Sequence, residues 1–318
     1  MKHLLDFEKP YIDLQRRLEE LREQPEETDV PLDIGDEIRQ LEEKIEAKKR
    51  ELYSNLSAWQ RVQLARHPQR PYSLDYINKT FSGFSELHGD RLFHDDHAIV
   101  AGFAMLGERR VMVVGTQKGR DTKENIKRNF GCAHPEGYRK ALRIMGMANR
   151  FGLPIVCLID TAGAYPGVAA EERHIAKAIA INLREMTLFS VPMISVVIGE
   201  GGSGGALGIG VSDRTLILEN AYYSVISPEG CAAILWKDRA AAPQAAEALK
   251  ITANDLHELN LVDEVVPEPL GGAHNDHDAM ADTLRDALLR NLNELEHPEI
   301  RLQERYAKYR RHGKYIEG

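Results

Sequence analysis

Apolar residues recur at helical spacing in the first part of the chain. Leu14, Leu18 and Leu21 fall on one face of a helix, and a second set between residues 38 and 52 has the same spacing. Residues 25–35 separate the two sets and contain proline and glycine, which end helices. We therefore expect two amphipathic helices, and we expect them to pack against the protein's own core rather than to form a free coiled coil.

The pattern changes to strands after residues 65–72, a connector with two prolines in four positions that cannot be helical. Two apolar, β-branched runs follow, at residues 98–106 and 110–116. Gly107 lies in the short gap between them. This arrangement predicts a β-hairpin.

From Gly137 onward, apolar strands alternate with helices, which predicts an α/β core. Strands that are joined by helices run parallel, and the usual crossover between them is right-handed. The expected elements are a helix through Leu142 and Met145, a strand at 155–159, a helix at 171–189, and strands at 193–198 and 215–218.

The last third of the chain adds shorter elements. Residues 222–226 predict a further strand, and Ser227 is expected to cap a helix that reaches Trp236. Residues 267–272 predict a turn, and polar helices that contain leucine are expected from Asp276 to the end.

Composition limits the class of protein. With 318 residues, 43% of them hydrophobic, the chain can bury one large core or two modest ones. It has no apolar run of the roughly 18 residues that a membrane span needs, and its first eight residues lack the apolar stretch that is typical of a secretory leader. We therefore expect a soluble, cytoplasmic protein with no membrane partner. Its three scattered cysteines predict neither a disulfide framework nor a metal site on this chain.

Negative charge is concentrated at the start of the chain. The net charge is −8, and residues 1–56 carry 10 Lys and Arg against 16 Asp and Glu, which accounts for −6 of it. The remainder is nearly neutral, which argues against a general nucleic-acid-binding protein.

Residues 199–205 contain five glycines in seven positions, between a predicted strand and a predicted helix. In open α/β sheets, ligands bind beyond the carboxyl ends of strands, and residues 160–167 form a second glycine-rich turn in such a position. Glycine lets a ligand approach the backbone, and the N–H groups of a helix N-terminus then face it. Tight helix packing would explain one or two of these glycines, but not readily five.

A dinucleotide site is one interpretation of this stretch. Gly199-x-Gly201-x-x-Gly204 matches the fingerprint, and Glu219 follows about 20 residues later. However, such a unit usually opens its fold, whereas here a hairpin and an α/β unit precede it. No Gly-Lys-Ser/Thr follows, which excludes a P-loop.

A serine hydrolase is the second interpretation. Ser203 occupies the centre of a Gly-x-Ser-x-Gly motif, and Asp263 and His274 follow in an order that a hydrolase can use. His274 nevertheless lies in a glycine-rich turn without a distinctive neighbourhood, and serine is common wherever small residues are required, so this interpretation is weak.

The third interpretation is an oxyanion site. The N–H groups of Gly204 and Gly205 would polarise a carbonyl group and hold the negative charge that develops on its oxygen. This use needs no side chain, which agrees with how few the stretch offers. A scaffold protein without catalytic activity remains the alternative to these three interpretations.

Residues 117–131 carry five positive charges against two negative ones. A solvated surface helix is the usual explanation of such a run. Because it directly follows a core strand, a cradle for phosphate or carboxylate groups is the functional alternative. Asp160 and Glu200 are either acid/base candidates or acceptors that stabilise the glycine-rich turns.

Taken together, these residues resemble the α subunit of bacterial acetyl-coenzyme A carboxylase carboxyltransferase. The resemblance runs from about Leu5 to beyond His274. It rests on residues 65–72, 117–120, 129–131, 135–141, 163–167, 199–207, 224–231 and 267–274.

The resemblance implies a crotonase-like α/β fold, a spiral of ββα units with added N- and C-terminal helices. We expect N-terminal helices at 1–60, a carboxyltransferase core at 61–272 and C-terminal helices at 273–318. The family transfers a carboxyl group from carboxybiotin to acetyl-CoA, which gives malonyl-CoA for fatty acid synthesis.

The resemblance also implies partners. Two α subunits assemble with two β subunits, and the β subunit carries a zinc ribbon. The biotin is attached to the biotin carboxyl carrier protein rather than to this chain, and biotin carboxylase completes the larger complex.

Carried over by position, Gly204 and Gly205 would be the oxyanion donors, most naturally to the ureido carbonyl of biotin. The chain departs from the family at Ala162, where proline is common, so the rigidity of that turn is in question. The residues expected to contact carboxybiotin or coenzyme A are Gly201, Gly202, Ser203, Thr161, Ala162, Gly163, Tyr165, Lys118 and Arg120.

Overall fold

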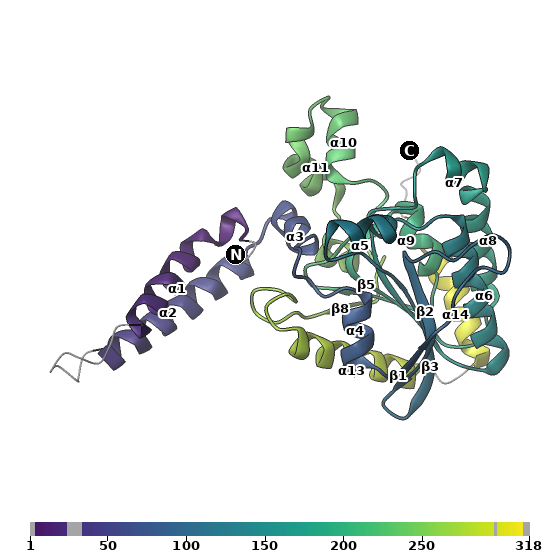
Figure 1. Ribbon diagram of the computed structural model, residues 1–318, viewed down its shortest axis with the longest axis horizontal. Helices are drawn as coiled ribbons and strands as arrows, with labels where there is room; N and C mark the ends of the chain where they lie inside the picture. Colours follow the sequence, from purple (N-terminus) through teal and green to yellow (C-terminus); the bar gives the residue numbers. More distant parts are fainter. Residues whose placement is uncertain (1–3, 24–33, 296–297, 314–318) are drawn as a thin grey trace.

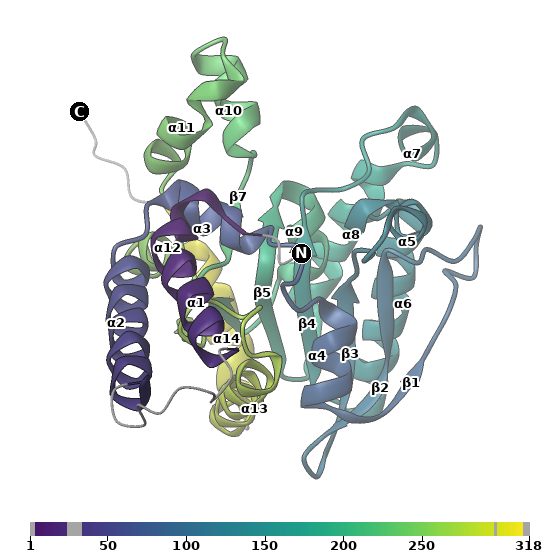
Figure 2. The same ribbon diagram turned by 60° about the vertical axis from the view of Figure 1, so that its left-hand side comes forward.

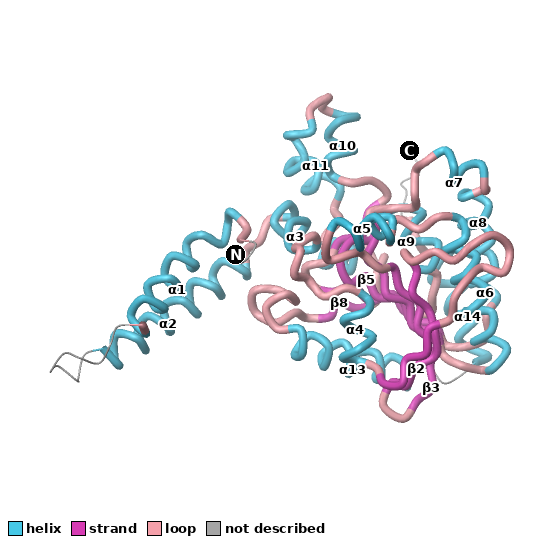
Figure 3. The backbone as a smooth tube through the Cα atoms, in the orientation of Figure 1, coloured by secondary structure: helices cyan, strands magenta, loops and turns pink. Residues whose placement is uncertain are grey.

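The computed structural model describes residues 4–23, 34–295 and 298–313. Within these residues, one mixed sheet of eight strands forms the centre of the molecule, with helices on both faces (Figures 1 and 3). The strand order is β1-β2-β3-β4-β5-β6-β8, and β7 pairs with β5. The strands are β1 (Ser82–Glu86), β2 (Ile99–Leu106), β3 (Arg109–Thr116), β4 (Ile155–Thr161), β5 (Met193–Gly202), β6 (Arg214–Leu218), β7 (Tyr222–Ser224) and β8 (Glu264–Val266).

The predicted hairpin is confirmed. β2 and β3 pair antiparallel from Ile99 opposite Thr116 to Leu106 opposite Arg109. Gly107 turns the chain with a φ of +59°, a conformation that costs glycine little because it has no Cβ.

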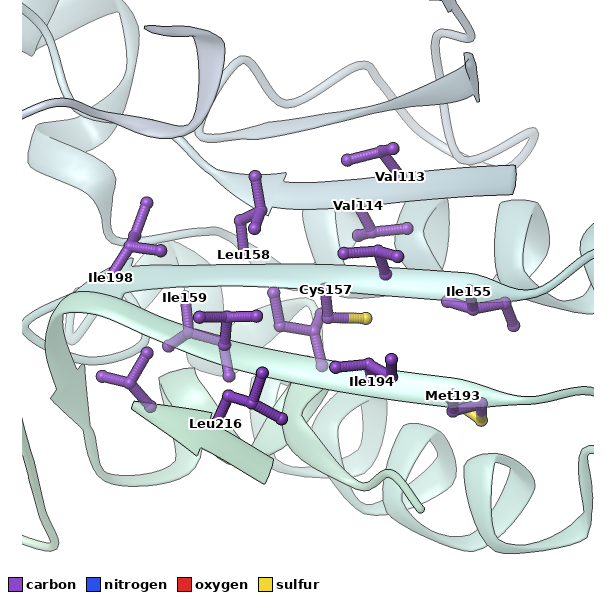
Figure 4. Close-up of a cluster of buried hydrophobic side chains, with 14 of the residues drawn as sticks. Val113, Val114, Ile155, Cys157, Leu158, Ile159, Met193, Ile194, Ile198 and Leu216 are labelled. Atoms are coloured by element: carbon purple, nitrogen blue, oxygen red, sulfur yellow. The ribbon is translucent and has the colours of Figure 1, made fainter. Parts of the chain in front are cut away.

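The parallel core is also confirmed, since β3, β4, β5, β6 and β8 pair parallel in that order. Every residue of β4 and of β5 is buried, as expected for strands covered on both faces. Figure 4 shows part of this core, where side chains of β3 to β6 pack together. It includes Val113, Val114, Ile155, Cys157, Leu158, Ile159, Met193, Ile194, Ile198 and Leu216.

Helices cover both faces of the sheet. α4 packs on β1 to β4 and on α13, whereas α6 packs on β2 and β3 from the other face, together with α8 and α9 (Figure 2). α14 lies against α8. These helices are α4 (Ser73–Thr80), α6 (Pro135–Phe151), α8 (Ile175–Leu188), α9 (Ser203–Gly210), α13 (His277–Glu294) and α14 (Pro298–Arg310).

The shorter helices connect these layers. They are α3 (Ala58–Ala65), α5 (Thr122–Lys127), α7 (Val168–Glu172), α10 (Pro228–Leu235), α11 (Ala242–Leu249) and α12 (Ala253–Glu258), with the 3-10 turns η1 (Asp6–Glu8), η2 (Asn129–Gly131) and η3 (Arg239–Ala241). The helix predicted at 171–189 is in fact two, because His174 has a φ of +65° between α7 and α8 and interrupts the helical backbone.

Ser227 caps α10 as predicted, since its Oγ accepts a hydrogen bond from the N–H of Gly230 at 3.1 Å. The preceding strand ends at Ser224, two residues earlier than predicted. α10 and α11 project from the body of the molecule (Figures 1 and 2). No helix among the described residues is long and apolar enough to cross a membrane.

The N-terminal segment forms two helices, α1 (Lys9–Arg22) and α2 (Ile34–Ser54), as predicted, and most of the predicted break lies outside the described residues. The prediction that they pack against the core is wrong for most of their length. α1 and α2 pack on each other and extend away from the sheet as a helical hairpin (Figure 1). Among the described residues, their base joins the body, where Tyr11 and Tyr53 form an apolar cluster with Leu64 of α3. The two apolar stripes cover each other, so neither requires the core.

Candidate active site

The glycine-rich stretch is not a simple turn after β5. Residues 200–202 continue β5 and pair with β7, and the helix α9 begins at Ser203. The prediction of a glycine-rich turn at residues 199–205 is therefore wrong for residues 199–202, which belong to β5. Glycine is common in a strand where another segment of backbone lies in the space that a side chain would fill.

Close packing explains four of the five glycines, which corrects the expectation that it would explain only one or two. A Cβ on Gly202 would lie 2.1 Å from the carbonyl oxygen of Ala162, and a Cβ on Gly205 would lie 2.4 Å from the carbonyl carbon of Gly163. Gly199 and Gly201 have comparable clashes, at 2.5 Å from Asp160 and 2.8 Å from Tyr223. The turn after β4 is thus pressed directly against the start of α9.

Gly204 is the exception. A Cβ at this position would meet only the side chain of Ile179, at 3.6 Å, which is an ordinary contact. Packing alone therefore does not require glycine here.

The start of α9 offers free backbone donors. The first N–H groups of a helix have no partner inside the helix. In the described part of the chain, the N–H groups of Gly204 and Gly205 have no hydrogen-bond acceptor. The helix dipole adds partial positive charge at the same point. Tyr138 supports this end of α9 by donating from its hydroxyl to the carbonyl oxygen of Gly205, at 3.3 Å.

The β4 turn, residues 161–164, is closed by its own threonine. Thr161 Oγ1 accepts from the N–H of Gly163 at 3.1 Å and donates to the carbonyl oxygen of the same residue at 2.8 Å. Thr161 is buried and Ala162 is exposed. These bonds close the turn without a proline at position 162.

Tyr165 is held beside this turn. Its ring stacks on His134 with the ring centroids 4.0 Å apart, and its N–H donates to the carbonyl oxygen of Ala133 at 3.0 Å. Gly167 lies close to the ring, since a Cβ there would be 2.4 Å from it.

Beneath the two turns, Lys118 bridges two carboxylates. Its Nζ lies 2.7 Å from Asp160 Oδ1 and 2.7 Å from Glu200 Oε2. The side chains of Asp160 and Glu200 are 2% and 9% exposed, and that of Lys118 is 14% exposed. Burial would lower the pKa of Lys118, but the two carboxylates outweigh burial and raise it. Burial would raise the pKa of Glu200, yet Lys118 and Arg66 lower it to about 2.

Sequence reasoning missed the second cation of this cluster. Arg66, just after α3, donates from Nε to Glu200 Oε1 at 2.7 Å, and Tyr222 donates its hydroxyl to the same oxygen at 2.6 Å. Arg66 also pairs with Glu229 at the start of α10. Arg66 lies within the connector that carried the family resemblance, but nothing local in the sequence indicates that it reaches β5.

The structure divides the basic segment 117–131. α5 is an exposed helix, which confirms the surface-helix interpretation for residues 122–127, whereas Lys118 turns inward. Arg120 is also engaged within the chain. It pairs with Asp75, donates to the carbonyl oxygen of Pro68 at 2.7 Å and lies 3.8 Å above the ring of Tyr72.

The hydrolase constellation is not assembled. Asp263 pairs with Lys308 and accepts from the N–H of Thr215 at 2.7 Å. His274 stacks on His67 with the ring centroids 3.9 Å apart. Among the described residues, no hydrogen bond joins Ser203 to either group. Ser203 does have a φ of +46°, as a strand-to-helix elbow requires.

The dinucleotide interpretation fails on topology. Gly199 and Gly201 lie inside β5 rather than in a loop that faces a ligand. Glu219 accepts a hydrogen bond from the N–H of Glu268 at 3.1 Å, so it stabilises the sheet edge.

An apolar pocket of about 300 Å³ opens beside Ser203. Leu207 of α9 lines one side, and Tyr223, Leu256, Tyr309 and His312 line the rest. Sequence reasoning could not place the last two residues here, since they come from the far end of the chain. In the part of the chain that the structure describes, no group of three or more His, Cys, Asp or Glu side chains is placed to hold a metal ion.

Comparison with known proteins identifies related chains. The profile of a family described as acetyl co-enzyme A carboxylase carboxyltransferase-like matches residues 4–313. The chain is 56% identical over 315 residues to acetyl-coenzyme A carboxylase carboxyl transferase subunit alpha of Thermus thermophilus, covering 98% of this chain and 99% of the relative. It is 54% identical over 318 residues to the protein of the same name from Geobacter metallireducens, covering 99% of both chains.

Solved structures share the fold at low identity. The transcarboxylase 12S core superposes with a TM-score of 0.56 at 22% identity, over 70% of this chain and 40% of that one. A Pseudomonas malonate decarboxylase hetero-tetramer in complex with coenzyme A gives a TM-score of 0.56 at 16% identity, over 68% of this chain and 90% of that one. These neighbours confirm the expected crotonase-like α/β fold.

Proposed function

Because the chain belongs to the acetyl-coenzyme A carboxylase carboxyltransferase-like family, we propose that it acts as the α subunit of such a carboxyltransferase. It takes part in moving a carboxyl group from carboxybiotin to acetyl-CoA, which gives malonyl-CoA for fatty acid synthesis. The observation that carries this proposal is identity of 54% or more with curated α subunits over nearly the whole of both chains.

The chain's contribution to the reaction is made by its backbone. The N–H groups of Gly204 and Gly205 donate to the ureido oxygen on which negative charge gathers as the carboxyl group leaves. Each donor of this kind contributes on the order of 3 kcal/mol to the transition state. Their lack of partners in the described chain, at the positive end of α9, fits such an acceptor.

Carboxybiotin supplies the carboxyl group. After the carboxyl group has left, the ureido nitrogen of biotin can accept the proton of the acetyl methyl group. This chemistry agrees with the state of the nearby carboxylates. Glu200 is ionised with a pKa of about 2 and is bonded to Arg66, so it is a poor general base. Asp160 is bonded to Lys118 and to the N–H of Glu200.

The β4 turn supports the same site. Its residues 161–164, closed by Thr161, pack against Gly202 and Gly205, so the turn and the start of α9 form one surface. The proposal places carboxybiotin on this surface, next to Ala162, Gly163 and Ser203.

We further propose that a β subunit completes the site and that two α and two β subunits assemble. The zinc ribbon then lies on the β subunit, the biotin on its carrier protein, and biotin carboxylase in the larger complex.

Co-expression tests the proposal. The chain is expected to copurify with a zinc-ribbon-bearing β subunit, and the complex is expected to form malonyl-CoA from acetyl-CoA and carboxylated biotin, while the separate chain is inactive. Full activity of the chain alone, or an assembled complex without carboxyl transfer, would overturn the proposal.

A further inference from the structure

The pairing of β4 with β5 is interrupted next to the candidate site. Ile159 lies opposite Val197, but Thr161 lies opposite Gly201, so β5 advances by four residues while β4 advances by two. The regular ladder of backbone hydrogen bonds cannot fix the relative position of the two strand ends at such an irregularity.

Side chains replace the ladder at this point. Asp160 Oδ1 accepts from the N–H of Glu200 at 2.9 Å, inside the irregular stretch. The same oxygen accepts from Lys118 Nζ, which also reaches Glu200 Oε2. Asp160 directly precedes the β4 turn, and Glu200 lies three residues before α9. One buried cation therefore ties together the two segments that carry the site.

The stem of Lys118 is fixed as well. Gly131, with a φ of +78°, lies so close that a Cβ there would be 2.8 Å from Lys118 Cγ. The side chain is thus covered by η2 on one side and bound by two carboxylates at its end, which leaves it little freedom to reach a substrate.

We propose that Lys118 is a positioning residue of the carboxyl transfer: by binding Asp160 and Glu200 together, it sets the spacing between the β4 turn and the first turn of α9. This inference rests on the proposed function, because it concerns the same site. It replaces the sequence-based expectation that Lys118 contacts the substrate itself.

The surrounding charges explain why the lysine matters. Without it, two buried carboxylates would lie side by side without their shared cation, so they would separate or retain a proton between them. Arg66 would still bind Glu200, but it has no bond to Asp160 among the described contacts. The other titratable or charged groups that face this cluster in the described structure are Arg70, Tyr72, Tyr76, Cys132, Tyr222 and Glu229.

The first test is the Lys118→Met variant in the αβ complex. Methionine keeps most of the length of the side chain but removes its charge. We expect kcat to fall by about tenfold or more, while KM for acetyl-CoA and for the carboxylated biotin substrate stays within about twofold. Lys308→Met is the matched control, because Lys308 is also buried and ion-paired but lies with Asp263 at the β8 side of the sheet. It is expected to keep the wild-type kcat.

The second test is rescue. In Lys118→Met, protonation of the carboxylate pair relieves the repulsion, so kcat relative to wild type is expected to rise as the pH is lowered toward about 6. Adding Glu200→Gln removes one charge and keeps a hydrogen-bonding side chain. We expect the double variant to regain part of kcat and to lose this pH dependence.

Hydrogen exchange gives a readout that does not need activity. In Lys118→Met, peptides that cover residues 160–165 and 199–206 are expected to exchange faster than in wild type, and those of β2 to be unchanged. The double variant is expected to restore protection. Should Lys118→Met not assemble, the same measurements on Lys118→Gln and on the double variant carry the test.

The outcomes separate the inference from the proposed function. A wild-type kcat in Lys118→Met, a change confined to KM, or no rescue by Glu200→Gln would overturn the positioning role. A wild-type complex without carboxyl transfer would instead overturn the proposed function, and hydrogen exchange would then decide alone whether Lys118 fixes the two segments.

Discussion

The two glycines at the start of α9, Gly204 and Gly205, differ in whether the packing around them requires glycine. Gly205 is required by the backbone of the β4 turn, which lies where its Cβ would be. Gly204 has room for a methyl group beside Ile179. A methyl group added at Gly205 therefore disturbs the packing of the site, whereas one added at Gly204 does not.

Gly205→Ala is expected to lower kcat on the order of a hundredfold. The new methyl group would overlap the peptide between Gly163 and Ala164, so the two segments must move apart and the N–H donor of residue 205 moves with them. Gly204→Ala keeps its N–H and meets no backbone, so its kcat is expected to stay within a few-fold of wild type. Steady-state kinetics of the assembled complex measure both. A wild-type rate for Gly205→Ala would contradict the assignment of this turn.

Ser203→Ala is expected to keep most of the activity, since the proposed chemistry uses N–H groups and not the hydroxyl. Ser203 has a φ of +46°, so Ser203→Gly is the useful companion variant, because glycine adopts that conformation without strain. Malonyl-CoA formation by the complex is the measurement. Loss of all activity in a folded Ser203→Ala complex would contradict a mechanism that uses only backbone N–H groups.

At the scale of elements, the helical hairpin of α1 and α2 is attached through a small buried cluster. Glu8 accepts hydrogen bonds from the hydroxyls of Tyr11 and Tyr53, and these rings pack near Leu64 of α3. Lys49 of α2 also lies beside Gly271, and the described residues farther from this base pack mainly between α1 and α2. The attachment of the hairpin therefore depends on few residues, while the sheet does not depend on it.

Tyr53→Phe removes one donor from the buried carboxylate of Glu8, which costs about 1–3 kcal/mol. We expect the amides of α1 to exchange faster with solvent, while those of β4 and β5 keep their protection, because only the hairpin base loses a contact. Hydrogen exchange with mass spectrometry measures this. The control is Tyr306→Phe, whose side chain is 70% exposed. Equal loss of protection in α1 and in the sheet would show that the hairpin is part of the core.

At the scale of the whole molecule, buried ionisable groups join segments that are distant in the sequence. Arg70 binds both oxygens of Glu268, one of them at 3.0 Å, and so joins the connector after α3 to the turn before α13. His274 lies in the same region. Burial, with His67 and Arg70 nearby, lowers the pKa of His274 to about 3.

This pKa predicts a loss of stability in mild acid. Below a pH of 6.5 the unfolded chain binds a proton at His274 that the folded chain refuses until about pH 3, so stability falls as the pH drops through this range. The decrease in Tm between about pH 7.5 and about pH 5 is expected to be smaller in His274→Gln than in wild type. His257→Gln, at an exposed site, serves as control. An identical decrease in all three proteins would contradict the prediction.

Structural elements that depend on residues close together in the sequence could be predicted from the sequence. The β2–β3 hairpin, the parallel strands and the Ser227 cap depend on spacing over a few residues, and all are present. The family resemblance pointed to Gly204 and Gly205 of α9 as candidate oxyanion donors. Arg66 was not predictable as a partner of Glu200, because the two are 134 residues apart and nothing in local periodicity links them.

The sequence by itself determined the fold class, the family and the position of the glycine-rich stretch, because these follow from local pattern and motif. Only the tertiary structure decided that Gly199 and Gly201 belong to a strand, and that the α1–α2 hairpin leaves the core. It also turned Lys118 inward, onto carboxylates 42 and 82 residues away. The physical reason is that close backbone approach and buried charge pairing depend on which distant segments meet, and that is settled only when the sheet is assembled.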